Sequence, residues 1–549
     1  MRKLFYISAF FLLVTVNVFS SPYEMIPPGD PVLNDILYLS VESGKSILSF
    51  TPPLSPGEVM IFLESIDESQ LSQSAQEAYE RIQRRLDWQP PINLSDGNFS
   101  FMLNLGSTVE HRTQFNDNIS WYPEYTKIPP LISLPFRFNF GSNLQLYFEP
   151  IFAMDPEYYS KTGIFSHNVP YEIENYDQNL PLRAYLAFGG SWWNFQIGRD
   201  RLSFGTGHAG NLTFSDNAAF YEFARFSLFS SFLKYSLLVS QMPMDIRSND
   251  AGPDIWDGSH ESSKTNLERT NDRYFYFHRI EFKVFDILSI ALSEGVMAGN
   301  APIEIRYLNP AIIFHSLYSF WSYPDWDGNK DGDMNGSLCS IEVNWNIVES
   351  LAVYGQMVMN QYSTPYEAEN FENQPPNGLG YLLGGRFSHS FGNWGAVFFA
   401  EFIYTDPYLY MNPSPYSSII FMRSLGISRR RFQYSFIGYP RDRVTVSAGA
   451  LFFNGDIALS GEFTWLSQGE HGIKWDWTRG PENPEAFYET TPTGTAENSF
   501  ILSLGAKYKL NSYISFNIDV LGIVTFNNRH NLNEKAFGGQ AAASVIFQY

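Results

Sequence analysis

Cysteine is almost absent from this sequence, which has a single cysteine, Cys339, among 549 residues. One thiol cannot form an intramolecular disulfide, and it cannot supply the several sulfur ligands of a cysteine-rich metal site. Long apolar runs are also missing: after the N-terminal segment, no stretch offers the roughly 18 consecutive apolar residues that a membrane-spanning helix needs. The sequence therefore predicts neither a disulfide framework nor a helical membrane protein.

Positive charge is scarce, because 36 lysines and arginines face 57 aspartates and glutamates, which gives a net charge of −21. Nucleic acid is excluded as a partner, since binding phosphates requires a basic surface. Charged residues make up only 17% of the chain and aromatic residues another 17%, yet the mean hydropathy is slightly negative. This mixture is typical of a membrane barrel with an apolar outside, a polar lumen and aromatic girdles.

Residues 1–20 have the pattern of a secretory signal peptide. Arg2 and Lys3 provide the positive start, an apolar stretch follows, and Val18-Phe19-Ser20 provides a small-residue cleavage site. We expect the mature chain to start near Ser21 and to be exported.

Residues 21–92 predict three short helices. Asp30-Pro31 forms an N-cap and first-turn pair, and Ser55 with Glu58 forms a capping box. Apolar residues at helical spacing continue to Leu86, before Pro90. A bundle this small is marginally stable alone. We therefore expect a periplasmic helical bundle that docks on the mouth of a barrel; an independent adaptor for peptidoglycan or a partner protein is the alternative.

Residues 97–549 alternate between apolar and polar side chains, which indicates one β-strand after another. The last strand ends in Tyr549, and a terminal strand with a final aromatic residue is typical of outer-membrane barrels, where it pairs with the first strand. Short turns and long polar connectors also alternate, as periplasmic turns and extracellular loops do. A soluble β-sandwich would not keep that alternation. The predicted fold is an all-β membrane barrel of about 18 antiparallel transmembrane strands.

The same alternation places charged residues of both signs on the lumen side. Such mixed charges brace a wall more often than they select an ion. The positions predicted to face inward are Arg137, Glu149, Arg183, Arg279, Glu281, Lys283, Glu294, Glu342, Arg386, Glu401, Glu462, Lys507, Lys509 and Asp519.

The connector around residues 321–335 combines flat aromatic side chains with acids. Trp321, Tyr323 and Trp326 can stack on sugar rings, and Asp325 can accept hydrogen bonds from hydroxyls. Asp327, Asn329, Asp331 and Asp333, with Gly332 at the sixth position, match the start of a calcium loop. Leu338 stands where that loop needs a bidentate acid. Bound Ca²⁺ and a solvated Asp/Asn/Gly turn both remain open.

The connector 467–497 presents a second aromatic surface. Trp475 and Trp477 lie well inside it, so we expect them to contact a saccharide, although membership in the outer aromatic girdle is the alternative. Tyr408, Tyr410 and Tyr416 could add a third aromatic wall.

Catalysis is not expected. Ser203, His208 and Asp200 are the residue types of a hydrolase triad, but the glycine-rich stretch around them is explained more simply as a tight loop turning back over the barrel. Asp325 and Asp327 are too close together on one loop for a glycosidase pair.

Two stretches resemble the Wzi family of outer-membrane capsule-assembly proteins. They are Ile197–Ser215, which begins Ile197-Gly198-Arg199-Asp200-Arg201, and Glu304-Ile305-Arg306-Tyr307-Leu308-Asn309-Pro310. The resemblance extends over most of the mature chain and implies a monomeric barrel that acts as a surface lectin in the cell outer membrane. Arg199 and Asp200, at the upper end of the first stretch, are further candidates for binding polysaccharide.

The sequence thus favours a protein that anchors capsular or another surface polysaccharide and is not an enzyme. Its other expected partners are outer-membrane lipid and, during insertion, the barrel-assembly machinery. No cofactor is required, apart from the candidate Ca²⁺. A porin or sugar-uptake channel is the alternative function.

Overall fold

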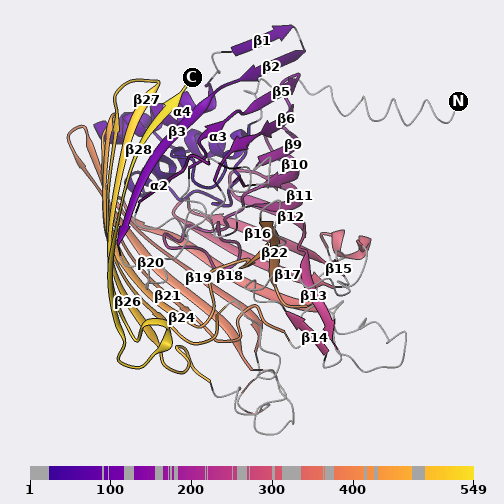
Figure 1. The fold of residues 1–549 in the computed structure, drawn as a ribbon. Helices are drawn as coiled ribbons and strands as arrows, with labels where there is room; N and C mark the ends of the chain where they lie inside the picture. The colour runs from indigo at the N-terminus through magenta and orange to yellow at the C-terminus, as the bar shows by residue number, and fades with distance from the viewer. Residues whose placement is uncertain are drawn as a thin grey trace, which may run out of the picture.

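The structure is a computed structural model of the chain (Figure 1). It describes most residues, with the exception of the N-terminal segment and parts of the connectors. The described residues are 24–88, 92–96, 98–115, 129–154, 165–170, 172, 176–177, 183–216, 218, 220–249, 252–255, 269–270, 273–299, 303–311, 335–362, 364, 366, 376–412, 417–425, 431–472 and 489–549.

One large antiparallel sheet dominates the molecule, and two small sheets, β13–β15 and β22–β23, accompany it. The strands are β1 (Ile92–Asp96), β2 (Phe99–Leu103), β3 (Gly106–Phe115), β4 (Ile132–Ser133), β5 (Phe136–Phe140), β6 (Leu144–Glu149), β7 (Ile151–Phe152), β8 (Phe165–His167), β9 (Arg183–Gly189), β10 (Trp193–Asp200), β11 (Tyr221–Phe229), β12 (Leu233–Gln241), β13 (Met244–Asn249), β14 (Gly252–Ile255), β15 (Arg269–Thr270), β16 (Tyr274–Val284), β17 (Leu288–Ala298), β18 (Asn335–Val348), β19 (Leu351–Gln361), β20 (Gly378–Phe391), β21 (Trp394–Thr405), β22 (Ile420–Leu425), β23 (Arg431–Phe436), β24 (Arg443–Phe453), β25 (Ile457–Gln468), β26 (Glu497–Lys509), β27 (Ile514–Phe526) and β28 (Lys535–Gln548).

The large sheet closes on itself into a barrel. Strand β28 pairs antiparallel with β3, from Gly539 opposite Phe115 to Gln548 opposite Gly106. The predicted closure of the last strand on the first is therefore confirmed. Three wall strands are interrupted, namely β2 with β3, β4 with β5 and β6 with β7. When each pair is taken as one strand, and the short β1 and β8 are set aside, the barrel has 18 strands.

The side chains that the alternation turns outward form an apolar belt. Exposed leucines and phenylalanines such as Leu292, Leu383 and Phe402 cover the middle of the wall. Among the outward aromatic residues, Tyr381 and Tyr404 lie at the end that carries the long connectors, and Trp192 and Tyr513 lie at the short-turn end. An apolar band between two aromatic girdles is the outer surface of a barrel that sits in a bilayer.

Helices form where the capping signals predict them. The N-cap Ser55 makes both hydrogen bonds of its capping box with Glu58. In the part of the chain that the structure describes, no helix is both long and apolar enough to cross a membrane. The helices are α2 (Val32–Glu42), α3 (Pro56–Glu64), α4 (Gln73–Leu86) and the short 3-10 turns η1 (Glu68–Gln70), η4 (Ile305–Leu308) and η7 (Asn528–His530).

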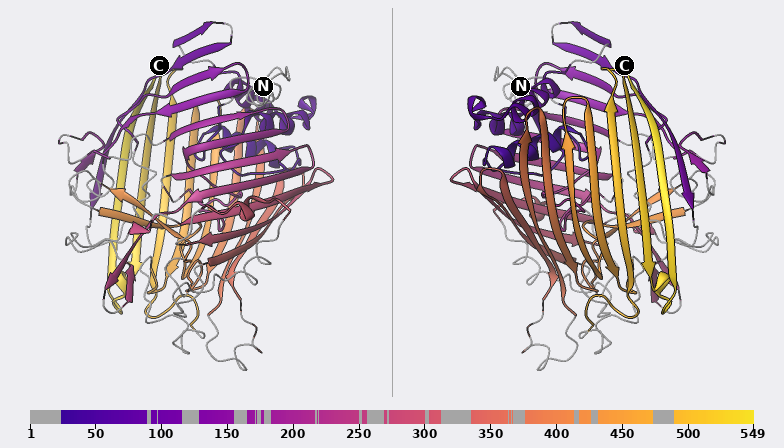
Figure 2. Two further views of the ribbon diagram at one scale, coloured as in Figure 1. Left: turned by 90° about the vertical axis from the view of Figure 1, so that its right-hand side faces the viewer. Right: turned by 90° about the vertical axis from the view of Figure 1, so that its left-hand side faces the viewer.

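The three α-helices lie inside the short-turn end of the barrel (Figures 1 and 2). Their apolar faces share one cluster, and the inward side chains Val397 and Phe453 of the wall pack against it. Tyr38 of α2 meets the Phe453 ring edge-on at 4.9 Å. The bundle therefore gains from the wall the apolar contacts that it is too small to make by itself.

Buried ion pairs fasten this bundle to the wall. Arg137 donates to Glu24 at 2.6 Å, and Arg85 of α4 lies 3.2 Å from the same carboxylate. Burial alone would raise the pKa of Glu24, but the two guanidiniums outweigh it and bring that pKa to about 2. Lys234 of β12 bonds Glu58 of α3, and this pairing lowers the pKa of Glu58 against the effect of its burial.

Strand register corrects one predicted inward position. Glu294 pairs across from Cys339 and His278, on the face opposite to Arg279 and Ala291, so it points to the outside of the barrel. There its carboxylate lies 3.2 Å from His278 Nε2. The prediction for Glu294 was wrong by one residue, because a shift of one position in a strand exchanges the two faces. The other predicted inward residues lie on the lumen face.

Candidate functional site

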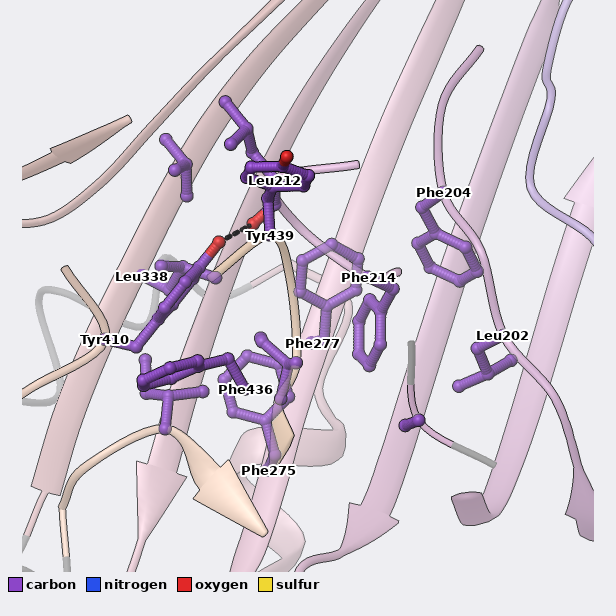
Figure 3. Packing of buried hydrophobic residues seen from close by; sticks show 14 of the residues in the cluster. Leu202, Phe204, Leu212, Phe214, Phe275, Phe277, Leu338, Tyr410, Phe436 and Tyr439 are labelled. Atoms are coloured by element: carbon purple, nitrogen blue, oxygen red, sulfur yellow. Dashed lines mark hydrogen bonds between the residues drawn. The ribbon is translucent and has the colours of Figure 1, made fainter. Parts of the chain in front are cut away.

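The first family-like stretch folds into the lumen. Residues 201–216 leave β10 at the connector end and turn inward, and Phe204 forms an isolated bridge with Phe214. Figure 3 shows these two rings packed against Phe275 and Phe277 of β16, with ring centroids 5.2 to 5.8 Å apart for the closest pairs. The stretch that the sequence explained as a loop turning back over the barrel therefore forms part of an internal plug.

This plug meets the helical end of the chain inside the barrel. Ser203 N–H donates to Pro52 O at 3.1 Å, and Gly205 N–H donates to Phe50 O at 2.8 Å. Residues 50–54 lie just before α3, so the plug segment 201–216 and the helical bundle touch directly in the lumen. Arg225 of the wall donates to Thr51 O at 3.0 Å and holds the same junction.

Gly205 shows how closely the plug fits the wall. Its φ of +121° is open to glycine, and a Cβ there would lie 1.6 Å from Gln356 Nε2. Gln356 of β19 donates to Phe204 O and Asn211 Oδ1 and accepts from Leu212 N–H at 2.8 Å. One buried amide therefore fixes three points of the plug.

A second connector completes the apolar core with its described residues 406–412, 417–420 and 435–442. Tyr410 is fully buried and its hydroxyl donates to Leu212 O at 2.6 Å (Figure 3). Ile419, Phe436 and Ile437 belong to the same cluster as Phe204 and Phe214. Two connectors that are far apart in sequence thus share one core inside the barrel. Because Tyr410 is buried in it, Tyr410 does not form part of an exposed aromatic wall.

His208 reaches the opposite wall and not a catalytic serine. Its Nε2 lies 3.0 Å from Glu462 Oε2, and its backbone N–H donates to Glu401 at 2.7 Å. Ser203 Oγ accepts from Asn211, and the Asp200 carboxylate is taken by Arg183 at 2.7 Å. The three residue types of a hydrolase triad therefore serve separate contacts that hold the plug.

The connector ends of β21, β24 and β25 form a polar cluster, which we call the rim cluster: Tyr408, Arg441, Asp442, His471, Glu489 and Thr493. Asp442 organises it, because its carboxylate accepts from His471 N–H at 3.0 Å, Thr493 N–H at 3.0 Å and Thr493 Oγ1 at 2.5 Å. These bonds tie the described starts and ends of the 467–497 connector to the wall.

Glu489 is the accessible acid of the rim cluster. Its side chain is 32% exposed, and it accepts from Tyr408 at 2.8 Å and lies 2.7 Å from His471 Nε2. The Tyr408 and His471 rings are 5.5 Å apart. Burial lowers the pKa of the nearby Arg441 to about 10, although Asp442 opposes the shift. Tyr408 and His471 are themselves buried, so the partly exposed carboxylate of Glu489 is the group that sugar hydroxyls can reach.

Of the predicted polysaccharide contacts, the structure describes Arg199 and Asp200. Asp200 is fully buried against Arg183, which braces β10. Arg199 lies on the outer face, where it bonds Glu222 at 2.5 Å and covers the Phe220 ring at 4.0 Å. Both side chains are occupied by partners in the wall, and their contact with polysaccharide stays a prediction.

The remaining predicted site residues lie outside the described residues. These are Trp321, Tyr323, Asp325, Trp326, Trp475, Trp477 and the candidate calcium ligands Asp327, Asn329, Asp331 and Asp333. Within the described ranges, no three His, Cys, Asp or Glu side chains gather as a metal site.

Sequence reasoning did not select Asp442, His471 or Glu489. Each stands alone in a polar connector, and only the fold brings together residues that are up to 47 positions apart in the chain. The one available signal was their position, since all three follow or precede a wall strand at the connector end.

A model of the capsule assembly protein Wzi family matches residues 131–422, a little more than half of the chain. The chain belongs to the Wzi capsule assembly protein family. No curated protein sequence matches it. The matched range covers both stretches that carried the resemblance, so the Wzi identification made from them is confirmed, as is the predicted location in the outer membrane.

Solved structures agree on the fold of this Wzi family member. The structure of Escherichia coli Wzi, described as an outer-membrane protein involved in group 1 capsule assembly and as a carbohydrate-binding β-barrel, is similar at 16% identity. It covers 95% of this chain and 98% of its own, with a TM-score of 0.56. Pseudomonas aeruginosa OccD3 covers 82% of this chain and 91% of its own, at 9% identity and a TM-score of 0.40, too low to bear on function.

Proposed function

We propose that this protein binds a surface polysaccharide at the connector end of the barrel and holds it on the cell, without processing or transporting it. Membership in the capsule assembly protein Wzi family supports this proposal. The carbohydrate binding reported for the Escherichia coli protein of the same fold supports it as well.

The observation that carries the proposal is that the lumen holds its own chain from both ends. The helical bundle enters from the short-turn end, the 201–216 segment enters from the connector end, and the two join between Gly205 and Phe50. A barrel filled in this way supports an attachment surface better than it supports a porin or an uptake channel.

The rim cluster offers the chemistry for attachment. Glu489 can accept hydrogen bonds from sugar hydroxyls, and the buried side chains of Tyr408 and His471 hold its carboxylate in place. Each such contact is weak, with a net worth of about 1 kcal/mol. A polymer that meets many copies of the protein would be held by the sum of many contacts.

The test is the partition of polysaccharide between cells and medium, with and without the gene. We expect a strain that lacks the protein to make the polymer but to release it into the medium. If the polymer stays attached without the protein, the proposal is wrong. Conductance of the purified barrel in a planar bilayer then decides whether it is a pore.

Variants locate the binding surface. Glu489→Gln removes the acid but keeps the shape of the side chain, and we expect it to weaken binding of purified polymer about tenfold, or about 1.4 kcal/mol. The matched control is Leu532→Ala, which changes an exposed side chain on another turn at the connector end. Equal loss in both variants would place binding elsewhere.

A further inference from the structure

Residues 303–308, which we call the flap, contain most of the second family-like stretch, lie on the outside of the barrel and have no part in the proposed function. Phe275 and Phe277 of β16 point into the lumen, where they meet the plug, so Tyr276 between them points outward. Tyr276 is nevertheless fully buried, because Tyr307 of η4 packs on it with ring centroids 4.9 Å apart.

Several contacts fix this flap to the wall. Glu304 N–H donates to Tyr276 OH at 2.8 Å, and Arg306 pairs with Glu304 while its guanidinium lies 4.8 Å over the Tyr307 ring. Val296 and Ala298, at the end of β17, complete the buried patch beneath it. The flap therefore has a defined position at the upper margin of the outer wall.

The flap turns its two isoleucines away from the wall, whereas Leu308 packs against it. Ile305 is 82% exposed and Ile303 is 55% exposed, whereas Tyr307 on the same segment is 1% exposed. Its height is that of the outer aromatic girdle, since it rests on Tyr276 with Tyr274 packed beside it. Directly below it on the outer face lies the His278–Glu294 pair, and the apolar belt begins one step further down with the exposed Leu292 of β17.

We propose that residues 303–308 form an interfacial membrane anchor, in which Ile303 and Ile305 insert among the lipid acyl chains next to the barrel. The flap stands at the upper margin of the lipid-facing belt, where the outward His278–Glu294 pair and its own Glu304–Arg306 pair suit the polar headgroup region. This explains the alternation within Glu304-Ile305-Arg306-Tyr307. Glu304 and Arg306 pair with each other, Tyr307 packs against the wall, and Ile305 is left to contact lipid.

Nitroxide accessibility tests the proposal in phosphatidylcholine vesicles. A spin label is placed by Ile305→Cys in a Cys339→Ser background, and its collisions with oxygen, which concentrates in lipid, are compared with those with a water-soluble nickel chelate. Leu292→Cys provides the lipid reference. Leu532→Cys provides the water reference, since Leu532 is 73% exposed on the turn after β27.

We expect the label at 305 to favour oxygen over nickel several-fold, as the label at 292 does. Ile303→Cys repeats the measurement if the first variant does not fold, and the heat-dependent gel mobility of each variant reports folding. A ratio equal to that at 532 would place the flap in water. Low access to both agents would indicate a covering protein. Either result overturns the proposal.

Discussion

Two groups of neighbouring strands in the barrel wall have the same alternation of inward and outward residues, but their inward side chains lie in different surroundings. On β12 and β16 to β20 the inward charges are buried: Lys234 is 1% exposed, Arg279 is 2% exposed and Glu342 is 3% exposed. On β25 to β27 the inward Ser460, Lys507, Lys509 and Asp519 are exposed to solvent. We call these the packed wall and the solvated wall.

The solvated wall is open only toward the short-turn end. Nearer the connectors, its inward Ser499 and Thr525 are 1% exposed and share a hydrogen bond of 2.9 Å, and Ile523 is buried beside them. Among the described residues, the inward face of these strands is therefore exposed near the short turns and buried near the connectors. A polar residue in a lumen can thus serve a plug or face water, depending on what fills the space beside it.

Removing a charge from the packed wall is expected to have the largest effect. Arg279 lies 2.9 Å from Glu281 and 3.1 Å from Glu342, and Arg279→Ala would leave both carboxylates buried without it. We expect a loss of about 3–5 kcal/mol in the free energy of unfolding. Urea titration of the protein in detergent, followed by heat-dependent gel mobility, measures it.

Lys507→Ala is the control on the solvated wall. We expect it to change the free energy of unfolding by less than about 0.5 kcal/mol, because surface substitutions usually do. Similar losses in the two variants would mean that the two walls do not differ.

Acid is expected to have the next largest effect, at the buried pairs of Glu24 that join the helical bundle to β5. Glu24 has a pKa of about 2 in the folded protein, below the ordinary value of 4.5, so it stabilises the fold above pH 4.5. That stability, about 3 kcal/mol, is lost as the pH falls from 4.5 through 2. Glu24→Gln should remove most of this pH dependence, whereas Asp519→Asn on the solvated wall should keep it. An unchanged profile in Glu24→Gln would show that this pair does not fasten the bundle.

The barrel could be predicted because strand alternation and turn spacing are local signals. The spacing of Ile514, Phe516 and Ile518 identifies the outward face of their strand from a few residues, and the same holds for nearly every wall strand. Glu294 was assigned to the wrong face because the run around it, Ala291-Leu292-Ser293-Glu294-Gly295, has small residues that do not mark a face clearly.

The plug could not be predicted, because its contacts are not local. Tyr410 was expected on an exposed aromatic wall, and it is buried against Leu212, 198 residues earlier in the chain. The rim cluster could not be predicted for the same reason. Asp442 and Thr493 are ordinary connector residues in the sequence, and only the fold brings them into contact. Only the motif at 197–215 marked a region of importance, and it did so through a family resemblance.

Two glycine substitutions compare the walls with a smaller expected loss in the free energy of unfolding. Gly205→Ala would press a methyl group into the buried Gln356 at a backbone φ that disfavours alanine, so we expect a loss of about 2–3 kcal/mol. Gly505→Ala on the solvated wall would meet only the side-chain oxygens of Ser460 and Asp519, which can move aside. We expect that variant to lose less than about 1 kcal/mol. The same urea titration compares the two, and a larger loss in Gly505→Ala would contradict the assignment.

A matched pair of serines separates the walls with the least disturbance. Ser236 of β12 and Ser460 of β25 both face the lumen, but Ser236 is 4% exposed and bonds Ser227 at 3.0 Å, whereas Ser460 is exposed. In a Cys339→Ser background, Ser460→Cys should react with a water-soluble maleimide about as fast as a free thiol, and neither variant should lose more than about 1 kcal/mol. Ser236→Cys should react at least about a hundredfold more slowly, because reaction there requires the plug to open locally. Equal rates would mean that the plug leaves the packed wall readily in solution, and the case for a closed attachment barrel would then fall together with the distinction between the walls.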